Sequence, residues 1–209
     1  MANLEYEKAH LAEYPVIAGV DEAGRGPLAG PVVAGAVILP REFVAEGLID
    51  DSKKLTAKQR ERAFEQITSE CIWGVGEVSP AEIDEINILQ ATMKAMRLAV
   101  EALRVKPDFL LIDGNYYSNT GIPFETIVKG DSKSLSIAAA SIVAKVSRDR
   151  YMTEIADKNY PEYGFARHKG YPTKKHFELI KKNGISDIHR ITFLRKFASR
   201  ESLIDEKIL

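Results

Sequence analysis

The sequence predicts an α/β fold built around a mixed β-sheet, and two observations support this prediction. Three apolar runs of strand length come first, at residues 16–20, 32–39 and 72–78. A helical pattern, two further apolar runs and a long helical pattern follow in that order. Strands and helices arranged in this way are typical of a layered α/β domain.

The first two strands are expected to form a hairpin. Residues 16–20 are an apolar run that ends in Asp21 and Glu22, and residues 32–39 are a second run rich in β-branched side chains. Residues 23–27 between them contain two glycines and a proline, which break regular structure. Two strands joined by such a loop predict a hairpin.

Two helices in the first half of the chain begin with capping residues. A helix over residues 56–68 starts at a threonine that is a suitable N-cap. In the next helix Ser79, Pro80 and Glu82 occupy the N-cap, N1 and N3 positions. Apolar residues then recur at helical spacing over residues 83–100, so we expect one continuous helix there.

The second half of the chain predicts two strands and two helices. Residues 109–112 are a fully apolar strand, and residues 125–128 are a shorter one. Residues 134–157 are a long helix whose small apolar face suits close packing. Residues 160–171 are rich in glycine, proline and aromatic side chains, which predicts a loop before a short helix over residues 174–182.

Length and composition are those of a soluble globular protein. The 209 residues, of which 45% are hydrophobic, suffice to bury a core without a metal or a disulfide. A single cysteine, Cys71, excludes an intramolecular disulfide and a cysteine-ligated zinc site. Residues 1–14 lack the apolar stretch of a signal peptide, and no apolar run approaches the roughly 18 residues of a membrane span. We therefore expect a cytoplasmic protein without membrane contact.

The net charge of −1 hides an uneven distribution along the chain. The chain carries 29 Lys and Arg against 30 Asp and Glu, but residues 167–200 hold ten basic and two acidic residues. A basic block of this density is typical of a surface that binds a polyanion, and a solvated helical face is the alternative.

Acidic residues mark the ends of three predicted strands. Asp21, Asp113 and Asp131 each stand at or just beyond a strand end near a glycine, and Glu22 doubles the first. Carboxylates are rarely buried together unless a cation lies between them, and oxygen ligands without His or Cys suit Mg²⁺ or Mn²⁺. Two such ions about 4 Å apart would activate water and stabilise a leaving oxygen in phosphoryl chemistry. For each acid taken alone, a strand-cap or turn role is the alternative.

The loop after the first acidic pair contains Gly24, Arg25 and Gly26. Glycine permits a positive φ and the close approach of a ligand, and backbone N–H groups in such a loop bind phosphates or hydroxyls. The loop lacks the length and the Lys-Ser/Thr ending of a P-loop. A tight hairpin turn is the alternative interpretation.

These motifs together are similar to those of a known family. Residues 20–32, Val-Asp-Glu-Ala-Gly-Arg-Gly-Pro-Leu-Ala-Gly-Pro-Val, resemble the signature of the type 2 ribonuclease H family, ribonuclease HII. Further segments match in family order over most of the chain, namely residues 51–55, 111–115, 129–134, 139–146, 168–173 and 189–193. The related type 3 enzymes usually carry lysine where Arg25 stands and an additional N-terminal domain, so the resemblance is to type 2.

The resemblance implies a ribonuclease H-like fold, with a five-stranded mixed sheet flanked by helices and a helical C-terminal part. Residues 1–209 would then form a single catalytic domain, in which residues from about 160 to 209 are a helical substrate-binding extension. The implied activity is an endoribonuclease that hydrolyses RNA in RNA–DNA hybrids and incises on the 5′ side of single ribonucleotides embedded in duplex DNA. The products would carry a 3′-hydroxyl and a 5′-phosphate, as ribonucleotide excision repair requires.

The resemblance also implies roles for particular residues. The catalytic acids of the family, which would hold two Mg²⁺ or Mn²⁺ ions, map onto Asp21, Glu22, Asp113 and Asp131. The backbone of Gly24, Arg25 and Gly26 would contact the ribose 2′-hydroxyl, and Tyr171 would pack on the deoxyribose after the RNA–DNA junction. Candidate phosphate contacts are Ser52, Lys53 and Lys133.

The implied partners are RNA–DNA hybrids and duplex DNA that contains ribonucleotides, with the protein acting as a monomer. A sliding clamp is a partner that the family allows, but residues 201–209 contain no clear clamp-binding peptide. Two alternatives stay open. A nucleic-acid-binding module that has lost catalysis would lack at least one of the four acids, and a metal-dependent enzyme acting on small phosphate esters would not need the basic block.

Overall fold

The computed structural model describes residues 2–45, 49, 52, 55–118 and 121–195, and the chain falls into two compact units. The first unit comprises Met1–Ala23, Val33–Glu77 and Thr92–Ser147. The second unit comprises Gly24–Val32, Val78–Ala91 and Arg148–Leu209. The C-terminal part expected from about residue 160 thus belongs to a unit that begins earlier and includes two segments from the first half of the chain.

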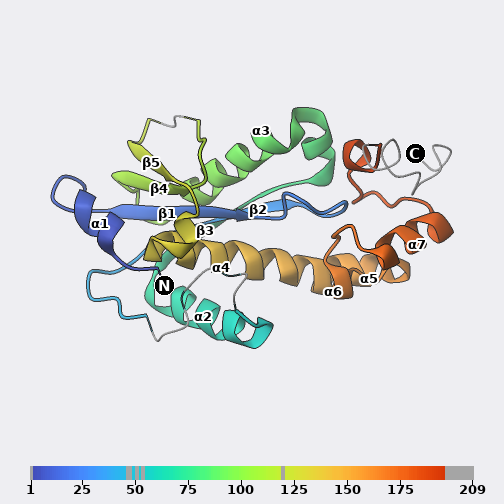
Figure 1. Ribbon diagram of the computed structural model, residues 1–209, viewed down its shortest axis with the longest axis horizontal. Helices are drawn as coiled ribbons and strands as arrows, with labels where there is room; N and C mark the ends of the chain where they lie inside the picture. The colour runs from blue at the N-terminus through green and yellow to red at the C-terminus, as the bar shows by residue number, and fades with distance from the viewer. Residues whose placement is uncertain (1, 46–48, 50–51, 53–54, 119–120, 196–209) are drawn as a thin grey trace. The chain divides into compact units, whose positions relative to one another are not determined.

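The five strands form one mixed sheet (Figure 1). In chain order they are β1 (Ile17–Ala23), β2 (Val32–Ile38), β3 (Ile72–Val78), β4 (Phe109–Asp113) and β5 (Phe124–Ile127). Their order across the sheet is β3-β2-β1-β4-β5. β1 and β2 are antiparallel, as in the predicted hairpin, whereas β1 pairs in parallel with β4 and β4 with β5. The predicted five-stranded mixed sheet is therefore confirmed.

Helices of the first unit cover both faces of the sheet. α2 (Ala57–Glu70) and α4 (Leu135–Arg150) lie along one face, and the part of α3 (Pro80–Glu101) that belongs to this unit lies along the other (Figure 1). α2 begins with a capping box in which Thr56 and Gln59 exchange hydrogen bonds, which confirms the predicted N-cap. No helix among the described residues is long and apolar enough to cross a membrane.

Glycines let the helices approach the sheet closely. A Cβ atom on Gly19 of β1 would lie 2.2 Å from the carbonyl carbon of Ser136 in α4. A Cβ atom on Gly76 of β3 would lie 2.1 Å from the carbonyl oxygen of Ala95 in α3. No side chain fits at such distances, so these two positions set the spacing between the sheet and its helices.

The sequence does not predict α1 (Glu5–His10), which is anchored by a buried carboxylate. Glu7 accepts hydrogen bonds from Ser134 Oγ at 2.6 Å and from Ser136 N and Oγ at 2.9 and 2.7 Å. These donors lie at the start of α4, so Glu7 caps α4 from a position 127 residues away from Ser134. Local sequence patterns carry no signal for a cap supplied from so far away.

The long helix expected over residues 134–157 is interrupted. α4 is followed by η2, a π-helix (Tyr151–Ala156), and then by the short α5 (Asp157–Asn159). Met152 of the π-helix is fully buried in the core of the second unit. A π-turn adds one residue per turn and shifts the following side chains, and apolar spacing does not reveal this shift.

The loop expected over residues 160–171 contains regular structure. η3 (Pro161–Tyr163) is a 3₁₀ turn, and α6 (Phe165–His168) is a short helix. Phe165 is fully buried and stacks on the tyrosine of η3, with ring centroids 5.3 Å apart. Two of the aromatic residues that suggested a loop, Tyr163 and Phe165, therefore form core, and α7 (Lys174–Asn183) follows as predicted.

α3 is also not the continuous helix that its apolar spacing predicts. Asn87 has φ 66° and ψ 163°, which are not helical values. Its side-chain oxygen accepts hydrogen bonds from the N–H groups of Leu89 and Gln90 at 3.0 and 3.2 Å. Asn87 therefore acts as an internal N-cap for the helical residues that follow it, and the apolar spacing continues across the break.

Candidate active site

Three acidic residues meet at one edge of the sheet in the first unit. β1 and β4 pair in parallel as far as Val20 and Ile112, so Asp21 and Asp113 follow at equivalent positions. β1 extends past Glu22, which places both acids of the first pair inside the strand rather than beyond its end. Carboxylate oxygens of Asp21, Glu22 and Asp113 lie within 4.8 Å of one another.

Asp131, the fourth predicted ligand, lies in η1 (Gly130–Ser132) and is 6% exposed. The backbone N–H of Gly130 donates a 2.7 Å hydrogen bond to Asp113 Oδ1, which ties this turn to the end of β4. The group of oxygens within 4.8 Å found among the described residues does not include Asp131, although its charge acts on Asp21. The structure thus brings three of the predicted acids together and places the fourth nearby.

The acidic cluster is electrostatically strained in the absence of a cation. Burial raises the pKa of Asp21 well above its usual value, and the negative charges of Glu22, Asp113 and Asp131 raise it further. One opposing contribution comes from the Glu22 N–H, which donates a 2.6 Å hydrogen bond to Asp21 Oδ1. Like charges held together in a buried position destabilise the folded state.

The donor set fits hard divalent cations. It consists of carboxylate oxygens, and no His or Cys side chain belongs to the cluster that the described residues form. Mg²⁺ and Mn²⁺ prefer such ligands, and their charge would relieve the repulsion that acts on Asp21. Asp21, Glu22 and Asp113 are the residues that would hold a cation, with Asp131 available nearby.

Two buried arginines hold the Gly-Arg-Gly loop in the second unit. The Arg190 guanidinium donates hydrogen bonds of 2.7 to 3.2 Å to three loop carbonyls, those of Gly24, Arg25 and Gly30. The Arg148 guanidinium donates hydrogen bonds of 2.9 to 3.1 Å to the carbonyls of Ala29, Pro31 and Lys169. Both arginine side chains are fully buried, so the loop is packed around them.

The two glycines of this loop have different surroundings. Gly24 has φ 99°, and a Cβ atom there would lie 2.2 Å from Arg148 Nε. A Cβ atom on Gly26 would meet only Tyr171 Cε1, at 4.0 Å, which is an ordinary van der Waals distance. Packing therefore requires glycine at position 24, whereas the described contacts leave room for a side chain at position 26. Tyr171 itself is 38% exposed.

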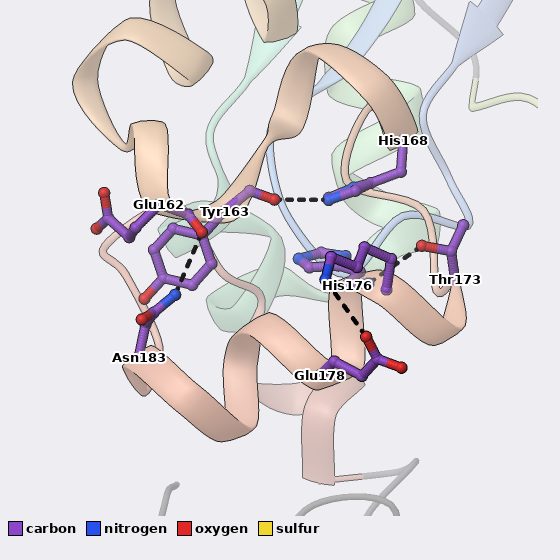
Figure 2. Close-up of polar contacts among 8 residues, drawn as sticks. Glu162, Tyr163, His168, Thr173, His176, Glu178 and Asn183 are labelled. Carbon is purple, nitrogen blue, oxygen red and sulfur yellow. Dashed lines mark hydrogen bonds and ion pairs between the residues drawn. The ribbon is translucent and has the colours of Figure 1, made fainter.

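Three histidines lie close together beside the backbone of Tyr171. His176 and His189 are buried and His168 is partly buried, and Figure 2 shows two of them, His168 and His176. His176 Nδ1 donates to the Tyr171 carbonyl at 3.0 Å, and His176 Nε2 lies 3.1 Å from His189 Nε2. His168 stacks on His176, with ring centroids 4.3 Å apart, and donates to the Tyr163 carbonyl. Burial lowers the pKa of His176 to about 3 and that of His189 to about 4, so both are neutral at pH 7. The network therefore holds the Tyr171 carbonyl through an uncharged histidine.

The candidate phosphate contacts differ in their surroundings. Ser52 is 5% exposed and its carbonyl accepts a hydrogen bond from Arg60, so it offers little surface to a phosphate. Lys53 lies outside the described residues. Lys133 is exposed, two residues after Asp131. The basic block contributes four exposed lysines on α7, namely Lys174, Lys175, Lys181 and Lys182.

The mixed five-stranded sheet, with clustered carboxylates on its parallel strands, defines the protein as one of the ribonuclease H-like fold class. Solved structures of this class are similar to the chain. The ribonuclease H2 of Pyrococcus horikoshii has a TM-score of 0.70 and 31% identity, over 88% of this chain and 98% of its own. The ribonuclease HII of Archaeoglobus fulgidus, solved in complex with PCNA, has a TM-score of 0.71 and 30% identity, over 84% and 94%.

Sequence comparison resolves the family within this class. The sequence profile of the ribonuclease HII family matches residues 18–196. Ribonuclease HII of Acetivibrio thermocellus is 59% identical over 194 residues, which are 92% of this chain and 75% of that protein. Ribonuclease HII of Caldicellulosiruptor bescii is 54% identical over 197 residues, 93% of this chain and 95% of that protein. The chain belongs to the ribonuclease HII family, whose members are endoribonucleases acting on RNA–DNA hybrids.

Sequence reasoning missed three buried residues: Arg148 and Arg190, which hold the segment between β1 and β2, and His176, which holds the Tyr171 carbonyl. A signal exists for Arg148, because Ala144, Arg148 and Met152 recur every four residues and all three are fully buried. A charged residue on an otherwise apolar helical face indicates a specific buried partner. The carbonyls that Arg190 holds are 160 or more residues away in the sequence, so no local pattern reveals its role.

Replacing Asp21 by Asn is expected to raise the free energy of unfolding of the metal-free protein at pH 7. The substitution removes a buried negative charge from the acidic cluster, and the direction of the pKa shift of Asp21 predicts a gain in stability. It should also reduce the stabilisation produced by added Mn²⁺. Denaturant unfolding in EDTA and in Mn²⁺ measures both effects, with the exposed Asp187→Asn as the control that changes neither. A lower stability of Asp21→Asn in EDTA would contradict the assigned repulsion.

The histidine network is expected to make the protein acid-sensitive. His176 and His189 have pKa values of about 3 and about 4 in the folded state, against 6.5 for an unperturbed histidine. Between pH 6.5 and about 4 the unfolded state therefore binds protons that the folded state does not. Each histidine should lower the free energy of unfolding by up to about 1.4 kcal/mol per pH unit in this range.

Urea unfolding between pH 7 and pH 5 measures this slope. His176→Asn keeps an amide that can donate to the Tyr171 carbonyl, so its slope should be shallower than that of the wild type. An unchanged slope in the double variant His176→Asn, His189→Asn would show that other groups control the acid response.

Proposed function

We propose that the chain incises duplex DNA on the 5′ side of a single embedded ribonucleotide, in addition to hydrolysing RNA in RNA–DNA hybrids. The products carry a 3′-hydroxyl and a 5′-phosphate. The observation that carries the proposal is the convergence of Asp21, Glu22 and Asp113, whose carboxylate oxygens lie within 4.8 Å of one another in a ribonuclease HII chain. Such a cluster suits metal-assisted phosphodiester hydrolysis.

The proposed cofactors are two Mg²⁺ or Mn²⁺ ions held by the acids Asp21, Glu22, Asp113 and Asp131. Divalent ions bound there would supply an activated water molecule and stabilise the leaving 3′-oxygen. The chain itself orients the ligands before substrate binds. The Glu22 N–H holds Asp21, and the Gly130 N–H holds Asp113, so neither carboxylate must be ordered during the reaction.

The proposed ribose contact is the backbone of Gly24, Arg25 and Gly26, which follows β1 directly in the chain. Arg25 and Gly26 are exposed, and a Cβ atom on Gly26 would meet only Tyr171. Space at a glycine lets a sugar approach the backbone, and the 2′-hydroxyl is the group that distinguishes RNA from DNA. Tyr171 would pack on the deoxyribose after the junction, where a second 2′-hydroxyl would fit poorly.

The proposed partners follow from the exposed charges. Lys133 and the four α7 lysines would neutralise phosphates, with Lys53 as a further candidate and Ser52 omitted because it is buried. We also propose that the protein acts as a cytoplasmic monomer. The Archaeoglobus fulgidus enzyme, solved in complex with PCNA, supports a sliding clamp as a candidate partner. Residues 201–209, which contain no clear clamp-binding peptide, lie outside the described residues.

A panel of three labelled duplexes tests the proposal: an RNA–DNA hybrid, DNA with one ribonucleotide, and DNA alone. We expect Mg²⁺- or Mn²⁺-dependent cleavage of the first two only, with incision on the 5′ side of the single ribonucleotide. Asp21→Asn is the inactive control, because it removes a buried ligand of the cluster. Full activity of this variant would exclude the metal assignment, and binding without any metal-dependent cleavage would favour a non-catalytic module.

A matched pair of glycine substitutions separates recognition from packing. Gly26→Ala should leave the unfolding midpoint unchanged, because its Cβ atom meets only Tyr171 at 4.0 Å. Its kcat/KM on the single-ribonucleotide duplex should fall at least about tenfold, since the added methyl group occupies space needed by the ribose. Gly24→Ala should lower the free energy of unfolding by about 1–3 kcal/mol, because of its clash with Arg148 and its positive φ. Unchanged activity of Gly26→Ala would contradict the proposed ribose contact.

A further inference from the structure

Arg190 is a buried cation that the proposed chemistry does not use. Its side chain is fully buried, and its guanidinium donates four hydrogen bonds to backbone carbonyls of the loop. Two of these carbonyls belong to consecutive residues, Gly24 at 2.7 Å and Arg25 at 3.2 Å. The negative charge of Asp84 favours the charged guanidinium, yet the guanidinium directs these hydrogen bonds to the loop carbonyls, so the arrangement calls for a purpose beyond packing.

The geometry of the peptide group shows what this arrangement does. No peptide bond among the described residues is cis, and in a planar trans peptide the C=O and the following N–H point in opposite directions. Since the carbonyls of Gly24 and Arg25 point toward Arg190, the N–H groups of Arg25 and Gly26 point away from it. Arg25 and Gly26 are the exposed residues of this loop, so those two N–H groups are directed to its outer side.

We propose that Arg190 is a positioning residue for ribonucleotide recognition, which orients the N–H groups of Arg25 and Gly26 toward the 2′-hydroxyl of the substrate. The inference deepens the proposed function and rests on it, because it assumes that this loop contacts the ribose. Arg190 does not touch the substrate and acts only through the two peptide groups that it holds.

The shape of the guanidinium explains why arginine suits this position. Nε and the two Nη atoms form a planar fork whose donors reach three carbonyls that point from different places along the loop. A lysine ammonium carries the same charge on one nitrogen and cannot span all three. Burial lowers the pKa of Arg190 to about 9, so it stays charged at pH 7. A charged donor polarises the carbonyls, which strengthens the N–H groups of the same peptides as donors.

The backbone around Arg190 is held as firmly as its side chain. Arg190 N–H donates to the Leu28 carbonyl at 2.7 Å, which places the residue against the same loop. The next two N–H groups, of Ile191 and Thr192, donate to the Asp84 carboxylate at 2.6 and 3.0 Å. The main chain that carries the Arg190 guanidinium is therefore held in place. The loop geometry that the guanidinium imposes is present before substrate binds.

Binding measurements on a cleavage-deficient background test the inference. The Asp21→Asn protein is titrated with two duplexes that differ only in one ribonucleotide, and it should prefer the ribonucleotide duplex. Arg190→Lys on this background should reduce that preference at least about tenfold, while affinity for the all-DNA duplex changes less than about twofold. In the active protein the same substitution should lower kcat/KM for the single-ribonucleotide duplex by a similar factor.

Arg148→Lys is the matched control for a buried arginine. It withdraws a guanidinium from the carbonyls of Ala29, Pro31 and Lys169 and leaves the Gly24 and Arg25 carbonyls with Arg190. At a comparable loss of thermal stability it should reduce the preference less than Arg190→Lys does. Equal reductions in both variants would mean that general loosening of the loop is responsible, and would overturn the inference.

A measurement without any Arg190 substitution keeps the inference testable should Arg190→Lys fail to fold. In ¹⁵N-labelled Asp21→Asn protein, the amide signals of Arg25 and Gly26 should shift with the ribonucleotide duplex and not with the all-DNA duplex. Equal responses to both duplexes would overturn the inference. If the Asp21→Asn protein shows no preference for the ribonucleotide duplex, the proposed function fails. If the Asp21→Asn protein prefers the ribonucleotide duplex, and the folded Asp21→Asn, Arg190→Lys protein keeps the same preference, the proposed function stands and only the role of Arg190 is refuted.

Discussion

The parallel pairing of β1 with β4, and of β4 with β5, is the constraint on which the rest of the site depends. Parallel strands end at one edge of a sheet, so residues from separate parts of the chain deliver carboxylates to the same place. The result opposes stability, because burial and like charges raise the pKa of Asp21. A site of this kind gains stability when it binds cations, which couples folding to the cofactor that the chemistry requires.

The first unit buries negative charges at the acidic cluster, whereas the second unit buries positive charges. Arg148 and Arg190 are buried cations, and both donate to carbonyls of the segment between β1 and β2. The segment can pack this closely only where a glycine has no side chain. At Gly30, for example, a Cβ atom would lie 2.3 Å from Met152 Sδ and 3.4 Å from Arg148 Nη2. Glycines in this loop therefore serve two purposes. Gly24 and Gly30 make room for the buried side chains of Arg148 and Met152. Gly26 leaves open space on the exposed side of the loop.

Features that depend on local chemistry were predictable, and those that depend on distant partners were not. The capping box at Thr56 and the hairpin of β1 and β2 follow from neighbouring residues, and both are observed. The break at Asn87 and the π-helix after α4 leave the apolar spacing almost unchanged, so periodicity misses them. The burial of Ser52 likewise follows from tertiary packing, because its sequence neighbours are polar.

The sequence by itself determined the mixed α/β architecture, the acids that cluster at the sheet edge, the Gly-Arg-Gly loop and membership of the ribonuclease HII family. Only the tertiary structure decided that Asp131 stands apart from the tight group of three acids, and that Arg190 supports the loop. The physical reason is the separation along the sequence between the residues that interact. Strand and cap signals act over a few residues, but Arg190 meets the carbonyl of Gly24 across 166 residues of sequence, and only folding brings such partners together.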